Sequence, residues 1–343
     1  MPTPSPSESN AALTSWFRVH IPDVRPPLTA TPLAGGHSNL TSRITDSAGR
    51  SWVLRRPPAG PLLATAHDVL REARVLTALH GSPVPTPSVH ASCADPSVLG
   101  APFFVMDWVE GLAATCAAAV APLTGAQRHA ASQAMADTLA AVHAVPIDAA
   151  GLGALGRREG YVSRQLRRWH AQWDAQRIDG LTEIDEAFER LSARVPEQRR
   201  TSLVHGDYRL DNCILGPDGA VRAVLDWEIC ALGDPLVDLG VLLAYWVEPG
   251  DEVRALEDPP TAAGGFATRE QLRRRYLAAS GLDESTDVTY YVAFAWWKLT
   301  CIVAGVAARA AQRPAAAGTR HAASYRSQLA RLAEHTRVLT RAL

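Results

Sequence analysis

The hydrophobic pattern of the chain changes character near residue 110. Between residues 28 and 110, short runs of alternating apolar and polar residues are separated by turn residues, which is typical of antiparallel strands. We expect strands at 40–45, 52–56, 88–92 and 102–109. One helix is expected at 67–80, where apolar residues follow the helical spacing and a Gly-x-Pro sequence ends the pattern. The pattern predicts a small sheet accompanied by one helix.

After Gly111 the chain becomes rich in alanine and its apolar residues follow the helical spacing. Helices are expected at 125–144, 161–176, 184–194, 269–279, 288–311 and 324–342. One β-like island interrupts them, with runs at 203–215 and 221–226 joined by a Gly-Pro-Asp-Gly turn, and it is predicted to be a hairpin. This order of elements predicts an α+β protein of two lobes, 28–110 and 111–343.

The remaining segment, 1–27, is interpreted as a lead-in to the first lobe. Residues 1–10 are polar and rich in Pro and Ser, which is typical of a disordered tail, and they lack the basic and apolar regions of a signal peptide. The 5 cysteines show no C-x-x-C spacing and their odd count fits no closed disulfide framework, which favours reduced thiols. We therefore expect a cytoplasmic protein.

Charge and hydropathy exclude two further classes. The 34 basic and 35 acidic residues give a net charge of −1, which argues against a nucleic-acid-binding protein because such proteins carry a net basic surface. The most apolar stretch, 290–308, contains Lys298, so we expect a buried core helix and no membrane span. Lys298 is also the only lysine, which excludes any mechanism that needs several lysines.

The β-like island carries the most informative polar sequence, HGDYRLDN at 205–212, and Asp226 ends its second run. Asp207 precedes Asn212 by five residues, which is the spacing of the kinase catalytic loop that is followed by a metal-binding Asp. Phosphoryl transfer needs a carboxylate that takes the proton of an acceptor hydroxyl, and hard oxygen ligands for Mg²⁺. Asp207 is therefore the candidate catalytic base, and Asn212 and Asp226 are the candidate metal ligands.

Two plainer interpretations compete with this one. Asp and Asn often cap turns and close hairpins, although three of them at this spacing in one island favour the catalytic interpretation. Alternatively, His205 and Asp207 could belong to a different metal site. No His, Cys or carboxylate cluster elsewhere in the sequence completes such a site.

Four segments also carry a resemblance to a known family. They are GGHSNLT (35–41), VLRRPP (53–58), HGDYRLDN (205–212), and LDWE (225–228) with GDPLVDLG (233–240). From residue 29 onward the chain resembles the aminoglycoside phosphotransferase and choline kinase-like superfamily of small-molecule kinases, and specifically the kinase-like domain joined to acyl-CoA dehydrogenases. The resemblance implies a bilobal protein-kinase-like fold, with ATP and Mg²⁺ bound between the lobes.

The resemblance further implies residues that bind the nucleotide. They are Gly36, Ser38 and Asn39 in a covering loop, Arg55 on a strand, and Met106 and Trp108 in the hinge between the lobes. Arg55 stands where the superfamily more often has a lysine. Its expected partner is Glu72, because a carboxylate on an apolar helix face needs a cation, with Asp68 as the competing choice. Asp238 is implied to be a structural support under the catalytic loop.

The sequence gives less information about the acceptor substrate than about the nucleotide. Trp227 and Glu228 follow Asp226 in place of the Phe-Gly of protein kinases, which argues against a protein substrate. The helix expected at 161–176 is basic, and arginine pairs well with carboxylate and phosphate, so an anionic acceptor such as a hydroxyacyl thioester of coenzyme A is one hypothesis. A solvated helix face is the plainer interpretation. The alternative functions are a macrolide or aminoglycoside kinase and a nucleotide-binding pseudokinase.

Overall fold

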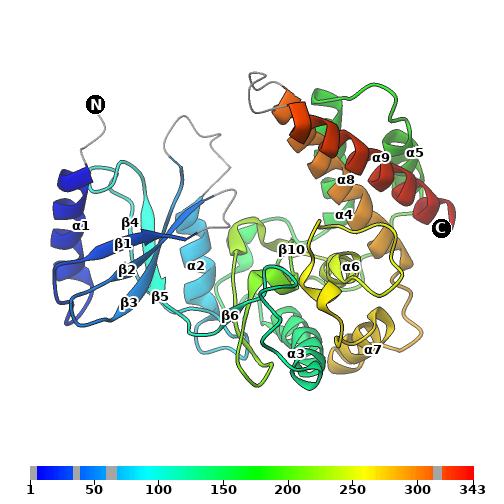
Figure 1. The fold of residues 1–343 in the computed structure, drawn as a ribbon. Helices are drawn as coiled ribbons and strands as arrows, with labels where there is room; N and C mark the ends of the chain where they lie inside the picture. Colours follow the sequence, from blue (N-terminus) through cyan, green and yellow to red (C-terminus); the bar gives the residue numbers. More distant parts are fainter. Residues whose placement is uncertain (1–5, 34–38, 59–67, 312–318) are drawn as a thin grey trace.

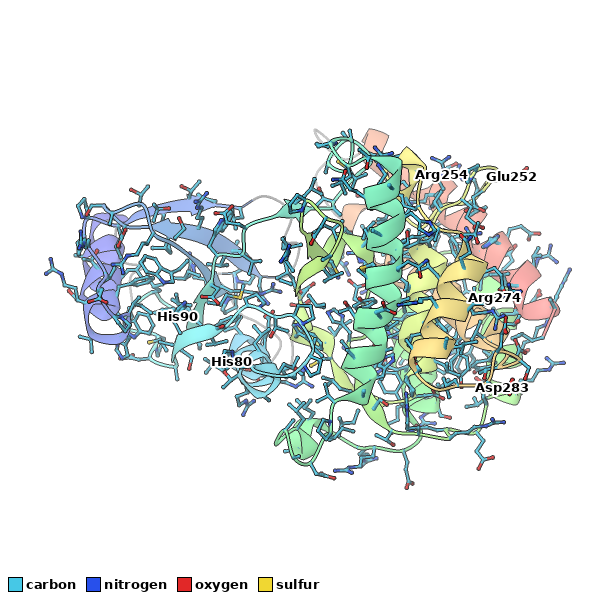
Figure 2. All side chains as sticks on the ribbon, turned by 90° about the horizontal axis from the view of Figure 1, so that it is seen from below. His80, His90, Glu252, Arg254, Arg274 and Asp283 are labelled. Carbon is cyan, nitrogen blue, oxygen red and sulfur yellow. The ribbon has the colours of Figure 1, made fainter. Side chains whose placement is uncertain are left out.

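The computed structural model describes residues 6–33, 39–58, 68–311 and 319–343. The chain forms two lobes, a β-rich N-lobe and a mainly helical C-lobe (Figure 1). Figure 2 shows the two lobes from below. His80 and His90 are labelled in the N-lobe. The residues labelled in the C-lobe, on the side away from the N-lobe, are Glu252, Arg254, Arg274 and Asp283. The predicted bilobal α+β architecture is confirmed.

The N-lobe is built on one antiparallel sheet. Its strands are β1 (Thr29–Pro32), β2 (Leu40–Thr45), β3 (Ser51–Arg56), β4 (Val89–Cys93) and β5 (Phe103–Asp107), in the order β1-β2-β3-β5-β4. In the register of β3, Arg55 lies opposite Thr41 on one side and Phe104 on the other. Since directly opposed residues share a sheet face, Arg55 points to the same side as Phe104.

Helix α2 (Val69–Leu79) lies between the sheet and the C-lobe (Figure 1). It begins at Asp68, whose Oδ1 accepts a hydrogen bond of 2.9 Å from the backbone N–H of Arg71. The side chains that α2 buries against this face of the sheet form one core: Val69, Ala73 and Leu76 with Val53, Phe104 and Met106. Glu72 is buried on the same side of the helix, so its carboxylate is directed at the sheet face that carries Arg55.

Helix α1 (Pro6–His20) covers the opposite, outer face of the sheet (Figure 1). Trp16 and Phe17 pack edge-to-face on Phe103 and Trp52. The prediction of a disordered tail over 1–10 is therefore wrong from Pro6 onward. The apolar residues that anchor the helix come after that polar stretch, and burial of an apolar face stabilises a helix more than the composition of its first turn.

The C-lobe contains the predicted helices, with boundaries shifted by a few residues. Its helices are α3 (Gly125–Ala144), α4 (Tyr161–Ala175), α5 (Glu183–Ala193), α6 (Leu236–Tyr245), α7 (Arg269–Ala279), α8 (Thr289–Ala311) and α9 (Thr319–Arg341). By length and composition, α8 could cross a membrane, but 78% of its most apolar window is buried inside the protein. Helix α8 is thus a core helix, as predicted.

The β-like island divides differently from the prediction. Strands β8 (Cys213–Leu215) and β9 (Val221–Val224) form the expected hairpin and pair with β6 (Leu112–Ala113), whereas β7 (Ser202–Val204) pairs with β10 (Ala231–Gly233). Residues 205–212 are consequently a loop between two small sheets, and not the start of a hairpin strand. The backbone N–H groups of His205 and Gly206 and the carbonyl of Asp207 bond to polar side chains.

Candidate active site

The 205–212 loop is fixed at its start by Asp238 of α6. The carboxylate of Asp238 accepts hydrogen bonds from the backbone N–H of His205 (2.6 Å) and of Gly206 (2.8 Å), and from Nε2 of His143 (3.2 Å). Burial opposes the charge, but the hydrogen bond and charge of His143 keep the pKa of Asp238 below its usual value. Asp238 therefore lies directly beneath the loop, where the family resemblance puts its structural support.

The first two residues of this loop shape its turn. Gly206 has φ of +86°, and a Cβ there would meet the Ile229 side chain at 3.2 Å, so glycine is strongly favoured. Nε2 of His205 donates to the carbonyl of Leu225 (2.9 Å), and its Nδ1 accepts from the N–H of Asp207 (3.3 Å). Both ring nitrogens are used within the protein, so His205 shapes the loop and the alternative metal site is not supported.

Asp207 is held by two donors at the centre of the loop. Its Oδ2 accepts hydrogen bonds from Nδ2 of Asn212 (3.0 Å) and from Nε of Arg209 (3.0 Å). Nδ2 of Asn212 also bonds to the backbone carbonyl of Asp207 (2.8 Å), which leaves the Asn212 amide oxygen as the free end of that side chain. The two residues that the sequence motif pairs are thus in direct contact.

Arg209 is a member of this group that the sequence interpretation missed. Its guanidinium bridges Asp207 and Asp211, the latter at 2.5 Å. Burial opposes the charge of Arg209, but these two carboxylates raise its pKa above the usual value, whereas burial raises the pKa of Asp211 to about 6. The available signal was an arginine flanked on both sides, two residues away, by an aspartate.

A second group of charges joins the two lobes around Arg55. Its Nε lies 2.9 Å from Oε2 of Glu72, and its Nη2 pairs with Oδ1 of Asp226. The contact with Glu72 is an ion pair whose angle does not make a good hydrogen bond. The pairing of Arg55 with Glu72 is as predicted, while the competing choice, Asp68, caps α2.

Asn39 and Glu228 extend this interlobe contact. Nδ2 of Asn39, at the start of β2, donates to Oε2 of Glu228 (2.9 Å), which also lies 3.7 Å from Nη2 of Arg55. Arg71 of α2 donates to the backbone carbonyls of Cys230 (2.6 Å) and Glu228 (3.3 Å). Glu228, which the sequence interpretation used only to exclude protein kinases, is therefore a contact point between the lobes.

Burial of Glu72 makes the stability of the protein depend on pH. Burial, with a further contribution from Asp226 and Glu228, raises the pKa of Glu72 from 4.5 to about 8 despite the opposing charge of Arg55. A raised pKa means that the stabilisation is complete below the ordinary value of 4.5 and is lost as the pH rises through about 8.

Glu72→Gln should therefore flatten this pH dependence. We expect the melting temperature of the natural protein to fall, relative to that of Glu72→Gln, between about pH 5 and about pH 8. Thermal unfolding of both proteins across this range measures the difference, with the exposed Glu252→Gln as the matched control (Figure 2). A constant difference between natural protein and Glu72→Gln would contradict the raised pKa.

A comparison with known protein families shows to which family the chain belongs. A family model described as the phosphotransferase enzyme family matches residues 29–288. The chain belongs to the phosphotransferase enzyme family. A solved structure from Ralstonia eutropha, provisionally described as an aminoglycoside phosphotransferase, is 30% identical with a TM-score of 0.81 and covers 96% of this chain and 98% of its own. Choline kinase from Cryptosporidium parvum shares the fold at 11% identity, with a TM-score of 0.65 over 96% of each chain. The protein is thus a small-molecule phosphotransferase.

Curated relatives of this phosphotransferase are longer proteins. Acyl-CoA dehydrogenase family member 10 of Mus musculus is 34% identical over 296 residues, covering 85% of this chain but 28% of the relative. Acyl-CoA dehydrogenase family member 11 of Homo sapiens is 31% identical over 287 residues, covering 82% and 36%. The chain therefore spans about a third of the length of these relatives, as the resemblance to a kinase-like domain joined to acyl-CoA dehydrogenases implies.

Four further residues of this phosphotransferase are predicted to bind the nucleotide, and the structure describes two of them. Gly36 and Ser38 lie outside the described residues. Met106 is buried opposite Val53 in the N-lobe core, while the ring of Trp108, after the end of β5, is covered by the guanidinium of Arg43 at 4.2 Å. Met106 thus lies in the core, two residues along β5 from the position opposite Arg55.

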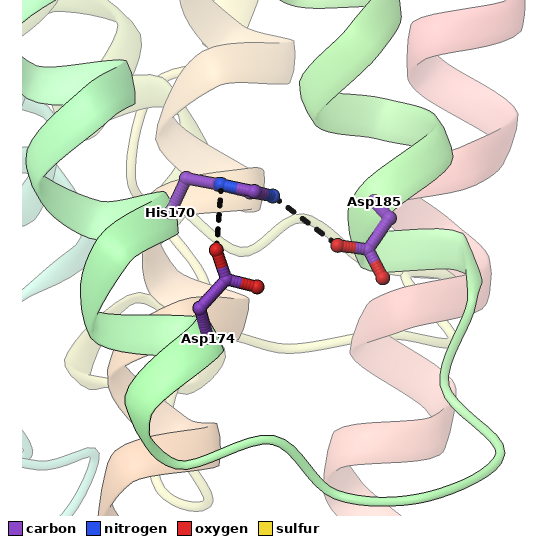
Figure 3. A group of neighbouring side chains, drawn as sticks. All are labelled: His170, Asp174 and Asp185. Carbon is purple, nitrogen blue, oxygen red and sulfur yellow. Dashed lines mark hydrogen bonds and ion pairs between the residues drawn. The ribbon is translucent and has the colours of Figure 1, made fainter.

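A separate cluster of possible metal ligands lies between α4 and α5 (Figure 3). The imidazole of His170 is placed between two carboxylates, with Nδ1 at 3.3 Å from Asp174 and Nε2 at 3.2 Å from Asp185. Arg177 also pairs with both carboxylates. Because one ion cannot use both ring nitrogens and the negative charges are already paired, this cluster links the two helices and is not a metal centre.

Proposed function

We propose that this phosphotransferase moves the γ-phosphoryl group of ATP, in the presence of Mg²⁺, to a hydroxyl group of a small molecule. The observation that carries the proposal is the arrangement of Asp207. Asn212 and Arg209 fix one of its carboxylate oxygens, yet the side chain is 25% exposed and can still reach a substrate. A fixed, accessible carboxylate is what in-line transfer to a hydroxyl requires.

In this mechanism Asp207 orients the acceptor and takes its proton. The acceptor oxygen forms a bond to the γ-phosphorus while the bond from that phosphorus to the bridging oxygen of ADP breaks. The hydroxyl proton passes to the carboxylate of Asp207, and ADP leaves with the bonding electron pair. Asn212 and Arg209 keep the carboxylate in place throughout, so it does not have to reorganise during the reaction.

The residues beside Asp207 fit a divalent cation. The amide oxygen of Asn212 and the carboxylate of Asp226 are hard oxygen donors. Asp226 and Glu228 both lie beside the single guanidinium of Arg55, so the site carries surplus negative charge that a cation would neutralise. Mg²⁺ would be held by Asn212 and Asp226 and would neutralise the phosphates of the nucleotide.

The N-lobe residues supply the nucleotide side of the proposal. Solved structures of the same fold contain GDP in an aminoglycoside 2′-phosphotransferase and ADP with hygromycin B in another aminoglycoside phosphotransferase. We assign the phosphates to Arg55 and Asn39, which both reach the C-lobe contact at Asp226 and Glu228. The adenine would lie at the hinge near Met106 and Trp108.

The acceptor that we propose is anionic, in the class of a hydroxyacyl thioester of coenzyme A. The start of α4 borders a depression of about 540 Å³ lined by arginines and by an N-terminus that no side chain caps; the residues are Arg157, Arg158, Glu159, Gly160, Ser163, Arg164 and Arg167. Burial, together with the neighbouring Arg157 and Arg167, lowers the pKa of Arg164. Accumulated positive charge of this kind favours an anion and disfavours a polycationic aminoglycoside.

An acceptor panel tests this function. We expect ATP- and Mg²⁺-dependent phosphorylation of a 3-hydroxyacyl-CoA, and no turnover of kanamycin, erythromycin or choline, measured as ADP release and as mass gain of the acceptor. Turnover of kanamycin or erythromycin would instead identify an antibiotic kinase. Nucleotide binding without turnover of any acceptor would identify a pseudokinase module and contradict the proposal.

Removal of the α4 arginines should act on acceptor affinity. We expect Arg164→Ser combined with Arg167→Ser to raise the KM for the 3-hydroxyacyl-CoA about tenfold, because each lost phosphate contact weakens binding, with little change in kcat. The matched control is Arg337→Ser, an arginine of α9 that pairs with Glu334. An unchanged KM in the α4 variant, measured at low ionic strength, would show that these arginines only face solvent.

A further inference from the structure

The only lysine of the chain reaches the catalytic loop from α8. Nζ of Lys298 donates a hydrogen bond of 2.7 Å to the backbone carbonyl of Gly206. That carbonyl belongs to the peptide group between Gly206 and Asp207. Lys298 therefore fixes the backbone next to Asp207, the candidate base. The sequence interpretation correctly excludes Lys298 from the N-lobe strand position, but it does not foresee this contact.

The turn at Gly206 is therefore held from two helices. Asp238 of α6 accepts from its N–H, and Lys298 of α8 donates to its C=O. The two helices approach closely at Gly240, where a Cβ would lie 2.4 Å from the backbone oxygen of Tyr291. The N–H and the C=O of Gly206 are thus each bonded to a side chain from a different helix, which fixes the orientation of both peptide groups of the turn.

The hydrogen bond to Gly206 does not by itself require a positively charged donor. The residue is 8% exposed, and within the described part of the chain no carboxylate lies within 4.0 Å of its ammonium. Burial lowers its pKa, the charges of Asp207 and Asp238 raise it, and those of Arg168 and Arg209 lower it further. A neutral amide could bond to the same carbonyl without the cost of burying a charge.

The position of Lys298 beside the catalytic loop gives its positive charge a role in the reaction. An ammonium has three N–H donors, and one of them is used by Gly206. Its attractive neighbours are Asp207, on the loop, Asp238, beneath it, and the ring of Trp169, whose centroid lies 5.7 Å from Nζ. During phosphoryl transfer, negative charge arrives beside Asp207 with the phosphoryl group and the acceptor oxygen, and a fixed cation next to them stabilises that charge.

We propose that Lys298 is a positioning residue for Asp207 in phosphoryl transfer: it fixes the Gly206–Asp207 peptide and places a cation beside the reacting groups. This inference rests on the function proposed above. It makes Lys298 part of the reaction although it lies on a helix that otherwise forms the C-lobe core. The residue forms no covalent bond and gives up no proton in this role.

Substitution of Lys298 separates positioning from folding. We expect Lys298→Met to lower kcat about 100-fold, the size expected for a misplacement of about 1 Å, while nucleotide affinity stays within about threefold. Lys298→Arg keeps the charge and donor and should recover part of kcat. The matched control is Thr300→Val on the same helix, which removes buried hydrogen bonds to Trp296 and Thr336 and should lower the melting temperature without lowering kcat.

A second measurement does not depend on activity. Because the chain has one lysine, protein labelled with ¹³C-lysine and carrying a lysine-free tag gives one lysine side-chain signal, and its pH titration reports Lys298 alone. We expect a pKa below the ordinary value, and a still lower one in Asp207→Asn, because the charge of Asp207 raises the pKa of Lys298.

The two measurements separate the possible failures. If the natural protein phosphorylates no acceptor but the lysine signal shifts in Asp207→Asn, the proposed function fails while the contact between Lys298 and the loop stands. If the natural protein is active and Lys298→Met keeps kcat within about threefold, Lys298 is only structural and the inference is overturned. An unshifted lysine signal in Asp207→Asn overturns it as well, since the ammonium would not then face Asp207.

Discussion

Asp207→Asn is expected to abolish phosphoryl transfer while nucleotide binding persists. The substitution keeps the size of the side chain and its contact with Asn212, but it removes the carboxylate that takes the hydroxyl proton. Loss of a general base lowers the rate about 100- to 10,000-fold, so we expect kcat to decrease at least 100-fold. Calorimetric titration with a non-hydrolysable ATP analogue should give an affinity within about threefold of the natural protein.

Asp211→Asn is the matched comparison for this prediction. Asp211 also pairs with Arg209 and lies in the same loop, but among the described residues the side-chain hydrogen bonds of Asn212 go to Asp207 and not to Asp211. We expect a much smaller loss of kcat from Asp211→Asn than from Asp207→Asn, because Arg209 keeps its second partner. Equal losses would assign the effect to the Arg209 bridge, and full activity of Asp207→Asn or Asp207→Ala would remove Asp207 from the mechanism.

The sequence predicts most of the fold because its elements are strongly patterned. The helix at 125–144 and the strand at 40–45 have the predicted bounds, since a capping Thr124 and a clear alternation mark their limits. The spacing of Asp207 and Asn212 also predicts that they meet, because only four residues of a tight loop lie between them. In each case the signal is local and a single element decides the outcome.

The contacts that could not be predicted are those between distant segments. Lys298 and Gly206 lie 92 residues apart, and Asn39 and Glu228 lie 189 apart, so no spacing rule connects them. The separation of β7 from the hairpin follows from its pairing with β10, a short strand with no alternation of its own. The interlobe and loop contacts thus depend on packing, whereas the motif that they support is visible in the sequence.

Arg55→Ala is expected to weaken both folding and ATP use. Arg55 is the cation that meets Glu72, which is 1% exposed, so its removal leaves a buried carboxylate without its ion-pair partner. At pH values above about 8, where Glu72 is ionised, breaking the buried pair in this way costs about 3–5 kcal/mol of stability. Loss of the guanidinium should also raise the KM for ATP sharply, because the proposed phosphate contact is absent. Urea unfolding and steady-state kinetics measure the two effects separately.

Arg55→Lys and Arg56→Ala define how specific this requirement is. Arg55 meets Glu72 through Nε and Asp226 through Nη2, and a single ammonium cannot reproduce that fork, so Arg55→Lys should keep only part of the activity. The side chain of Arg56, the next residue on β3, has one hydrogen bond among the described residues, to the Leu99 carbonyl (3.4 Å), and Arg56→Ala should behave like the natural protein. If Arg56→Ala loses ATP use and Arg55→Ala does not, the phosphate contact belongs to Arg56.

The double variant Arg55→Met with Glu72→Gln separates the two roles of Arg55. It removes both members of the buried pair and leaves Asp226, whose side chain is 31% exposed, without the guanidinium, so the stability should recover in large part toward that of the natural protein. ATP use should not recover, because the guanidinium assigned to the phosphates is still missing. Recovery of the KM for ATP together with stability would mean that Arg55 serves only to neutralise Glu72, and that other residues bind the phosphates.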